Sequence, residues 1–100
     1  MKFSDIPNSI LNVHNNYELQ KGIQTTKVEC KLRYPNCALF IAHKSDNTRT
    51  LFYARTGKRQ TSDDNWTWFC PSEHEIHYLM PQIWHFYDEL NSFNDNVRTH

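Results

Sequence analysis

Three side chains of metal-ligand type lie close together in the second half of the chain: Cys70, His74 and His77. Thiolate and imidazole groups are the ligands that zinc prefers, and Cys30 or Cys37 would complete a tetrahedral site. Structural zinc sites usually have closely spaced ligand pairs on both sides, whereas six residues separate Cys30 from Cys37. A small zinc-binding domain therefore stays an alternative, and the sequence predicts no metal or other cofactor.

Catalysis needs a nucleophile, a base and a group that orients the base, and the sequence has no motif that supplies them together. There is no nucleophile elbow and no paired-carboxylate motif. With two glycines in 100 residues, the chain also lacks a glycine-rich loop that would let backbone approach a phosphate. We therefore expect a protein that is not an enzyme.

Basic side chains are concentrated between residues 27 and 55, where the pattern predicts strands. Together with one tyrosine they would form a positively charged platform with a ring for base stacking, as in proteins that bind single-stranded nucleic acid. A solvated charged face is the ordinary alternative for an outer strand. The candidates are Lys27, Lys31, Arg33, Lys44, Arg49, Tyr53 and Arg55.

Residues 56–65 contain no apolar side chain, although a shorter connection would join the strands predicted on either side. Such a segment is either an ordinary polar surface loop or a place where binding residues are mounted on a rigid scaffold. Tryptophans follow it directly, and tryptophan and arginine are enriched at the centres of protein interfaces. The candidate partner-binding residues are Lys58, Arg59, Asp63, Asp64, Trp66 and Trp68.

The formal net charge of zero is the difference between two oppositely charged segments. Residues 21–59 hold nine Lys or Arg and two acidic residues, a net charge of +7, whereas residues 60–97 hold seven acidic residues and no Lys or Arg, a net charge of −7. Either the two segments pack together and screen one another, or each presents its charge to a different partner. The sequence alone leaves both interpretations open.

At the N-terminus, apolar residues recur at steps of three and four, which predicts a short helix with Pro7 in its first turn. These residues are Phe3, Ile6, Ile10, Val13 and Tyr17. Asn15 and Asn16 would allow the helix to end early, and the alternative is an edge strand over residues 10–13.

Strand patterns dominate the middle of the chain. Residues 27–34 alternate between apolar and charged side chains, which predicts one apolar face carrying Val28, Cys30, Leu32 and Tyr34. The continuous apolar run at residues 38–42 suits either a central strand covered on both faces or a strand whose outer face is lightly apolar. A turn at residues 45–48 leads to a returning strand at residues 50–55. A fourth strand is predicted at residues 66–70, where Pro71 stops it.

Ser72 and Glu75 fit a capping box, so a helix is predicted to start there and to kink or break at Pro81. The competing interpretation is a fifth strand over residues 75–80, with Pro81 opening the helix. Both interpretations include a helix over residues 82–91, with Ile83, Trp84 and Tyr87 packed on the sheet.

Together these patterns predict a single α+β domain over residues 1–100, in which one antiparallel sheet of four or five strands packs against a C-terminal helix. A short N-terminal helix covers an edge of that sheet. No signal peptide or membrane-length apolar run is seen, and the odd number of cysteines favours free thiols, so we expect a cytoplasmic protein without a membrane partner.

The function predicted from these features is a small, non-catalytic protein-binding domain. Short, asparagine-rich chains with oppositely charged halves are similar, in general character and in no motif, to immunity proteins and inhibitors of bacteria and phages. This similarity implies a partner that is a nucleic-acid-handling enzyme or complex. Binding of single-stranded nucleic acid through the basic strands is the principal alternative.

Overall fold

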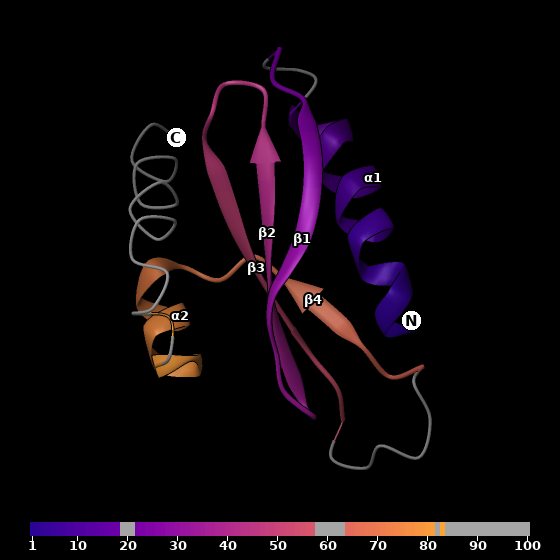
Figure 1. The fold of residues 1–100 in the computed structure, drawn as a ribbon, viewed down its shortest axis with the longest axis vertical. Helices are drawn as coiled ribbons and strands as arrows, with labels where there is room; N and C mark the ends of the chain where they lie inside the picture. Colours follow the sequence, from indigo (N-terminus) through magenta and orange to yellow (C-terminus); the bar gives the residue numbers. More distant parts are fainter. Residues whose placement is uncertain (19–21, 58–63, 82, 84–100) are drawn as a thin grey trace.

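The computed structural model describes residues 1–18, 22–57, 64–81 and 83, and its centre is a four-stranded antiparallel sheet (Figure 1). The strands are β1 (Thr25–Arg33), β2 (Cys37–Lys44), β3 (Arg49–Arg55) and β4 (Thr67–Phe69), and they lie in the order β1-β2-β3-β4. Every connection joins neighbouring strands, so the sheet is a simple meander. The predicted four-stranded antiparallel sheet is confirmed.

The predicted hairpin between β2 and β3 is confirmed, and its turn residues explain why it forms. Asp46 Oδ1 accepts hydrogen bonds from the backbone N–H and the hydroxyl of Thr48, at 3.0 and 2.6 Å. Asn47 has a φ of 66°, a left-handed conformation that asparagine tolerates better than most residues. The turn therefore fixes the register in which Ala42 pairs with Thr50 and Phe40 with Phe52.

Both faces of the sheet are covered, which is one of the two arrangements that fit the continuous apolar run in β2. All five residues from Ala38 to Ala42 have no exposed surface. Because side chains alternate between faces, two separate cores result. The α1-side core contains Ile6, Ile10, Ala38, Phe40, Ala42, Phe52, Ala54 and Trp66. The α2-side core contains Leu39, Ile41, Leu51, Tyr53, Ile76, Met80 and Ile83.

The N-terminal segment forms a short 3₁₀ helix (Phe3–Asp5) followed by α1 (Ile6–Glu18), which confirms the predicted helix and excludes an edge strand at residues 10–13. The helix continues through Asn15 and Asn16. It packs on the α1-side face of the sheet, mainly beside the edge strand β1, with Ile6 and Ile10 in the α1-side core (Figure 1). Val13, predicted to share this buried stripe, is 56% exposed.

The prediction of one apolar face on β1 is wrong, because the strand contains a register shift between Cys30 and Leu32. Cys30 pairs with Phe40, but Leu32 pairs with Leu39, so one extra residue on β1 opposes β2. The extra residue reverses which face the following side chains occupy. As a result Val28 packs against the α1-side core, whereas Leu32 packs against the α2-side core.

A capping box starts α2 (Glu73–Leu79), as predicted. The Ser72 hydroxyl accepts from the Glu75 N–H at 3.2 Å, and the Glu75 carboxylate accepts from the Ser72 N–H at 3.1 Å. The helix ends at Leu79, with Met80 as its C-terminal cap directly before Pro81, so the predicted break is confirmed and a fifth strand at residues 75–80 is wrong.

The helix predicted over residues 82–91 lies outside the described residues except for Ile83. That side chain has no exposed surface and belongs to the α2-side core, as predicted. Trp84 and Tyr87, the other predicted contacts of this helix, also lie outside the described residues.

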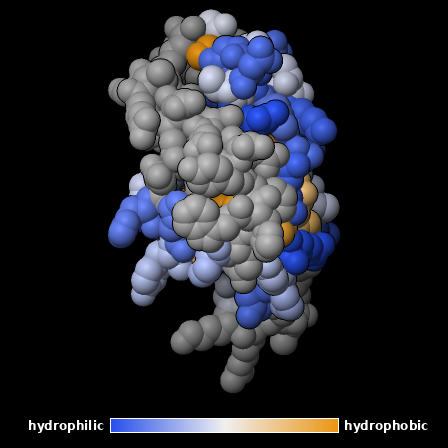
Figure 2. All heavy atoms as spheres, turned by 60° about the vertical axis from the view of Figure 1, so that its left-hand side comes forward, coloured by the Kyte–Doolittle hydropathy of each residue, from blue (hydrophilic) through white to orange (hydrophobic). Residues whose placement is uncertain are grey.

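Hydrophilic residues make up most of the described surface on the α2 side of the molecule, with small apolar areas between them (Figure 2). Within the described ranges, no helix is both long enough and apolar enough to cross a lipid bilayer.

Candidate functional site

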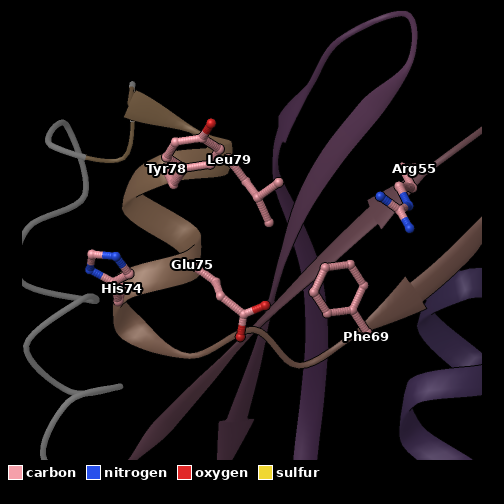
Figure 3. A pocket seen from close by; sticks show the side chains of 6 residues that line it. All are labelled: Arg55, Phe69, His74, Glu75, Tyr78 and Leu79. Carbon is pink, nitrogen blue, oxygen red and sulfur yellow. The ribbon is translucent and has the colours of Figure 1, made fainter.

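A groove of about 460 Å³ lies between α2 and the ends of β3 and β4 (Figure 3). Its walls come from three elements that are adjacent only in the folded chain. The lining residues are Arg55 from β3, Phe69 from β4, and His74, Glu75, Tyr78 and Leu79 from α2.

Strand pairing and helix packing together create this groove. Tyr53 pairs with Phe69 and Arg55 pairs with Thr67, so Arg55 and Phe69 come from the two adjacent strands β3 and β4. Pro71 and the Ser72 cap then turn the chain into α2, whose Ile76 and Met80 side chains are buried in the α2-side core. Since the helix is held by that face, its opposite face is left toward solvent.

The groove joins an apolar wall to one positive charge. Phe69 packs edge-on against Tyr53 with 5.6 Å between ring centroids, and the Arg55 guanidinium carbon lies 5.8 Å from the centroid of the Phe69 ring. Leu79, a residue of α2, extends from the helix toward the sheet (Figure 3). Tyr78 is 85% exposed at the rim, so its ring is available for contact with a partner.

The Glu75 carboxylate caps the start of α2. The Glu75 carboxylate accepts the Ser72 backbone N–H, and this bond, followed by the Ser72 hydroxyl, holds the pKa of Glu75 below its ordinary value of 4.5. His74 points to the outer side of the helix, away from Phe69 (Figure 3). The arrangement can therefore hold a ligand between Phe69, Arg55 and α2.

Neither this groove nor Tyr78 was predicted from the sequence as part of a site. The helical period nevertheless indicates that Tyr78 lies on the exposed side of α2. Ile76, Met80 and Ile83 are spaced three and four residues apart on the buried side. Tyr78 follows Ile76 by two residues, a rotation of about 200°, which places it on the opposite face of the helix.

The predicted partner-binding residues of the long loop fall into two groups. Lys58, Arg59 and Asp63 lie outside the described residues. Asp64 is exposed, and its backbone carbonyl accepts a hydrogen bond from the N-terminal ammonium group at 2.8 Å.

The two tryptophans after the loop hold α1 on the sheet. Trp66 is 2% exposed and packs against Phe3, with 4.9 Å between ring centroids. Trp68 is half-buried, packs edge-on against Phe52 and donates from Nε1 to the Ser9 hydroxyl at 2.9 Å. The burial of Trp66 leaves almost no ring surface for a partner, so its predicted role as an exposed anchor is replaced by a core role.

The predicted basic platform is divided among several environments. The Arg33 guanidinium carbon lies 3.7 Å from the centroid of the Phe3 ring, and Arg55 lines the groove. Tyr53 is 7% exposed, so its ring cannot serve as a stacking surface for a base. Lys44 is also buried. Of the predicted set, Lys27, Lys31 and Arg49 remain together.

These three cations belong to what we call the Glu29 cluster, which consists of Lys27, Glu29, Lys31, His43 and Arg49. The Glu29 carboxylate lies 3.7 Å from Lys27 Nζ and 3.5 Å from Lys31 Nζ. His43 Nε2 lies 2.6 Å from the same carboxylate, and Arg49 Nε donates to His43 Nδ1 at 3.2 Å. Because Nδ1 accepts, the neutral ring carries its proton on Nε2 and donates it to Glu29.

The hydrogen bond from His43 lowers the pKa of Glu29 below its ordinary value of 4.5, and the charges of Lys31 and Lys27 lower it further. A carboxyl group with a lower pKa in the folded state stabilises the fold above the pKa of the unfolded chain. That contribution is lost as the pH falls through the folded-state pKa.

We expect Glu29→Gln to be less stable than the native chain at neutral pH, with a difference that shrinks as the pH falls below 4.5. Urea unfolding at a series of pH values measures the difference. Asp5→Asn removes an exposed carboxylate of the same charge and is the matched control. A difference that stays constant from neutral to acid pH would contradict the role given to Glu29.

The zinc alternative depended on Cys70, His74 and His77 with a second cysteine. Across the described ranges, no group of three or more His, Cys, Asp or Glu side chains is arranged to hold a metal ion. Cys70 is exposed before α2, and His74 lies on the outer face of that helix.

A comparison of the chain with protein-family models, with curated proteins and with solved structures finds no match.

Proposed function

We propose that this chain is a small, non-catalytic binding domain whose main partner is another protein, and that the groove between β3, β4 and α2 is its binding surface. The observation that carries the proposal is the 85% exposure of Tyr78 at the rim of a groove walled by Phe69 and Leu79. An exposed tyrosine beside an apolar recess is typical of an interface centre.

The chemistry of the groove defines the partner segment. Phe69 and Leu79 favour an apolar side chain, because its contact removes apolar surface of both molecules from water. The Arg55 guanidinium favours a carboxylate, which it can bind with two parallel hydrogen bonds. We therefore propose a segment in which a large apolar residue stands close to an acidic one.

The non-catalytic part of the proposal is supported by the positions of the titratable groups. Glu75 is held by the capping box, and His74 lies on the outer side of α2, away from Phe69. The finer proposal, an inhibitor of a nucleic-acid-handling enzyme of bacterial or phage origin, is supported by the net charge of −7 over residues 60–97, which complements a basic partner surface.

The test is capture of a partner from bacterial lysate, with and without phage infection and with nuclease added to remove nucleic acid. We expect one protein to be retained by the native chain and lost with Tyr78→Ala or Arg55→Ala. If either residue contributes about 2 kcal/mol as an interface anchor, affinity for the purified partner falls about 30-fold.

Val13→Ala is the matched control, because Val13 is an exposed apolar residue on α1, on the opposite side of the sheet from the groove. Thermal unfolding of all variants checks that they remain folded. Equal retention of the partner by Tyr78→Ala and Arg55→Ala would remove the groove from the proposal. Recovery of no protein from any lysate would contradict the protein-binding function.

A further inference from the structure

The Glu29 cluster extends across three neighbouring strands on the α2-side face of the sheet. Lys27 on β1 pairs with His43 on β2, which pairs with Arg49 on β3, so these residues form one row perpendicular to the strands. Glu29 pairs with Ile41 in the next row on the same face. Figure 1 shows these three strands side by side near the β2–β3 turn.

A single carboxylate holds the positive groups in place. Lys27, Lys31 and His43 all contact Glu29, and His43 in turn receives the Arg49 Nε–H. Side chains that are already fixed lose less conformational entropy when a ligand binds. The cluster is therefore an ordered set of donors and not a collection of independent surface lysines.

The charges of the cluster favour an anionic ligand. Lys27, Lys31 and Arg49 are positive, whereas Glu29 is negative. The Lys27 side chain is 65% exposed. The bond from Arg49 to His43 uses Nε alone, so the two terminal amino groups of the guanidinium are not part of it.

The surroundings of the cluster distinguish between classes of anionic partner. Ile41 and Leu51, its neighbours on the same face, are completely buried, so neither offers the apolar anchor that a protein interface needs at its centre. A nucleic-acid backbone needs only positive groups at its phosphates. Since Tyr53 is also buried, no stacking surface for a base comes from that residue.

From these observations we infer that the Glu29 cluster is a binding site for the phosphates of a nucleic-acid backbone, independent of the proposed protein-binding groove. Lys27, Lys31 and Arg49 contact phosphate, and Glu29 and His43 are positioning residues. Without base contacts, the binding is insensitive to sequence.

The experiment measures the affinity of the full chain for fluorescein-labelled oligothymidylate at several salt concentrations. Three contacts with single-stranded phosphates give a slope of log K against log salt of about −2, because each contact contributes about −0.7. We expect Lys27→Gln and Arg49→Gln each to change the slope to about −1.4. Arg55→Gln removes the same charge from the groove, and its slope should remain that of the native chain.

Two further ligands complete the test. A duplex of the same length that binds with a slope of about −2.7 supports the site and identifies double-stranded nucleic acid as its ligand. Polyglutamate that binds as tightly as the oligonucleotide at equal salt would overturn the inference in favour of an acidic protein partner. An unchanged slope in folded Lys27→Gln and Arg49→Gln would also overturn it, and neither result affects the Tyr78 test of the groove.

Discussion

Replacing Phe40 by alanine should lower the free energy of unfolding by about 3–5 kcal/mol, the largest effect that we expect of any single substitution. Phe40 lies in the middle of the central strand, has no exposed surface and packs between α1 and the sheet. Its ring centroid lies 5.5 Å from that of Phe3. Truncation to alanine removes the apolar contact and leaves a cavity that the paired strands cannot close by moving.

Chemical denaturation followed by fluorescence measures this loss. A domain of this size has a total stability of about 5–15 kcal/mol, so the alanine variant is expected to be close to its folding limit. Phe40→Leu provides a milder variant that keeps most of the apolar volume and should lie between the native chain and Phe40→Ala. A loss below about 1 kcal/mol in both variants would contradict the central position of Phe40 in the core.

Local signals predicted much of the fold because local chemistry produces those elements. Asp46 stabilises the β2–β3 turn through a side-chain hydrogen bond, and Asn47 adopts the left-handed conformation that the turn requires. Both effects act within four residues. The capping box at Ser72 acts over the same distance. The apolar run at residues 38–42 predicted a strand, because no polar side chain interrupts it, and burial on both faces was one of two arrangements that fitted it.

The arrangement of the layers could not be predicted in the same way. The bulge in β1 changes the face of every later side chain, but the alternating sequence of residues 27–34 contains no residue that marks it. The short 3₁₀ helix and α1 were predicted as one helix, but which part of the sheet they cover depends on contacts of Phe3 and Ile10 with distant strands. Trp66 was expected at an interface, but it is buried. Its burial could not be predicted locally, because it depends on contact with Phe3, more than 60 positions away.

The two candidate sites also depend on contacts between residues that are far apart in the sequence. Arg55 and Tyr78 line the same groove because of the pairing of β4 with β3 and the direction of α2, neither of which a local pattern specifies. The Glu29 cluster depends on the register that aligns Lys27 with His43 and Arg49. Lys27, Lys31 and Arg49 were predicted only as part of a larger set of basic residues. His43 and Glu29 were not predicted as site residues, because isolated histidine and glutamate residues on strands are common.

The second large effect is expected from Ile76→Ala, which should lower the free energy of unfolding by about 2–5 kcal/mol. Ile76 has no exposed surface and joins α2 to Leu39 and Ile41 on the central strand. A helix of seven residues is not stable in water on its own, so α2 depends on this contact and on its capping box. The groove should therefore lose its helical wall when Ile76 is truncated.

Two measurements separate a global effect from a local one. Denaturation reports the stability of the whole domain, and amide hydrogen exchange compares Met80, whose N–H bonds to the Ile76 carbonyl, with residues of β2. His74→Ala, on the outer face of the same helix, is the control and should change stability by less than about 0.5 kcal/mol. If Ile76→Ala increases exchange at Met80 but leaves the denaturation midpoint and the protection of β2 unchanged, α2 opens independently of the sheet. In that case the α2-side core is not part of the cooperative unit, and the groove exists only when the helix is docked.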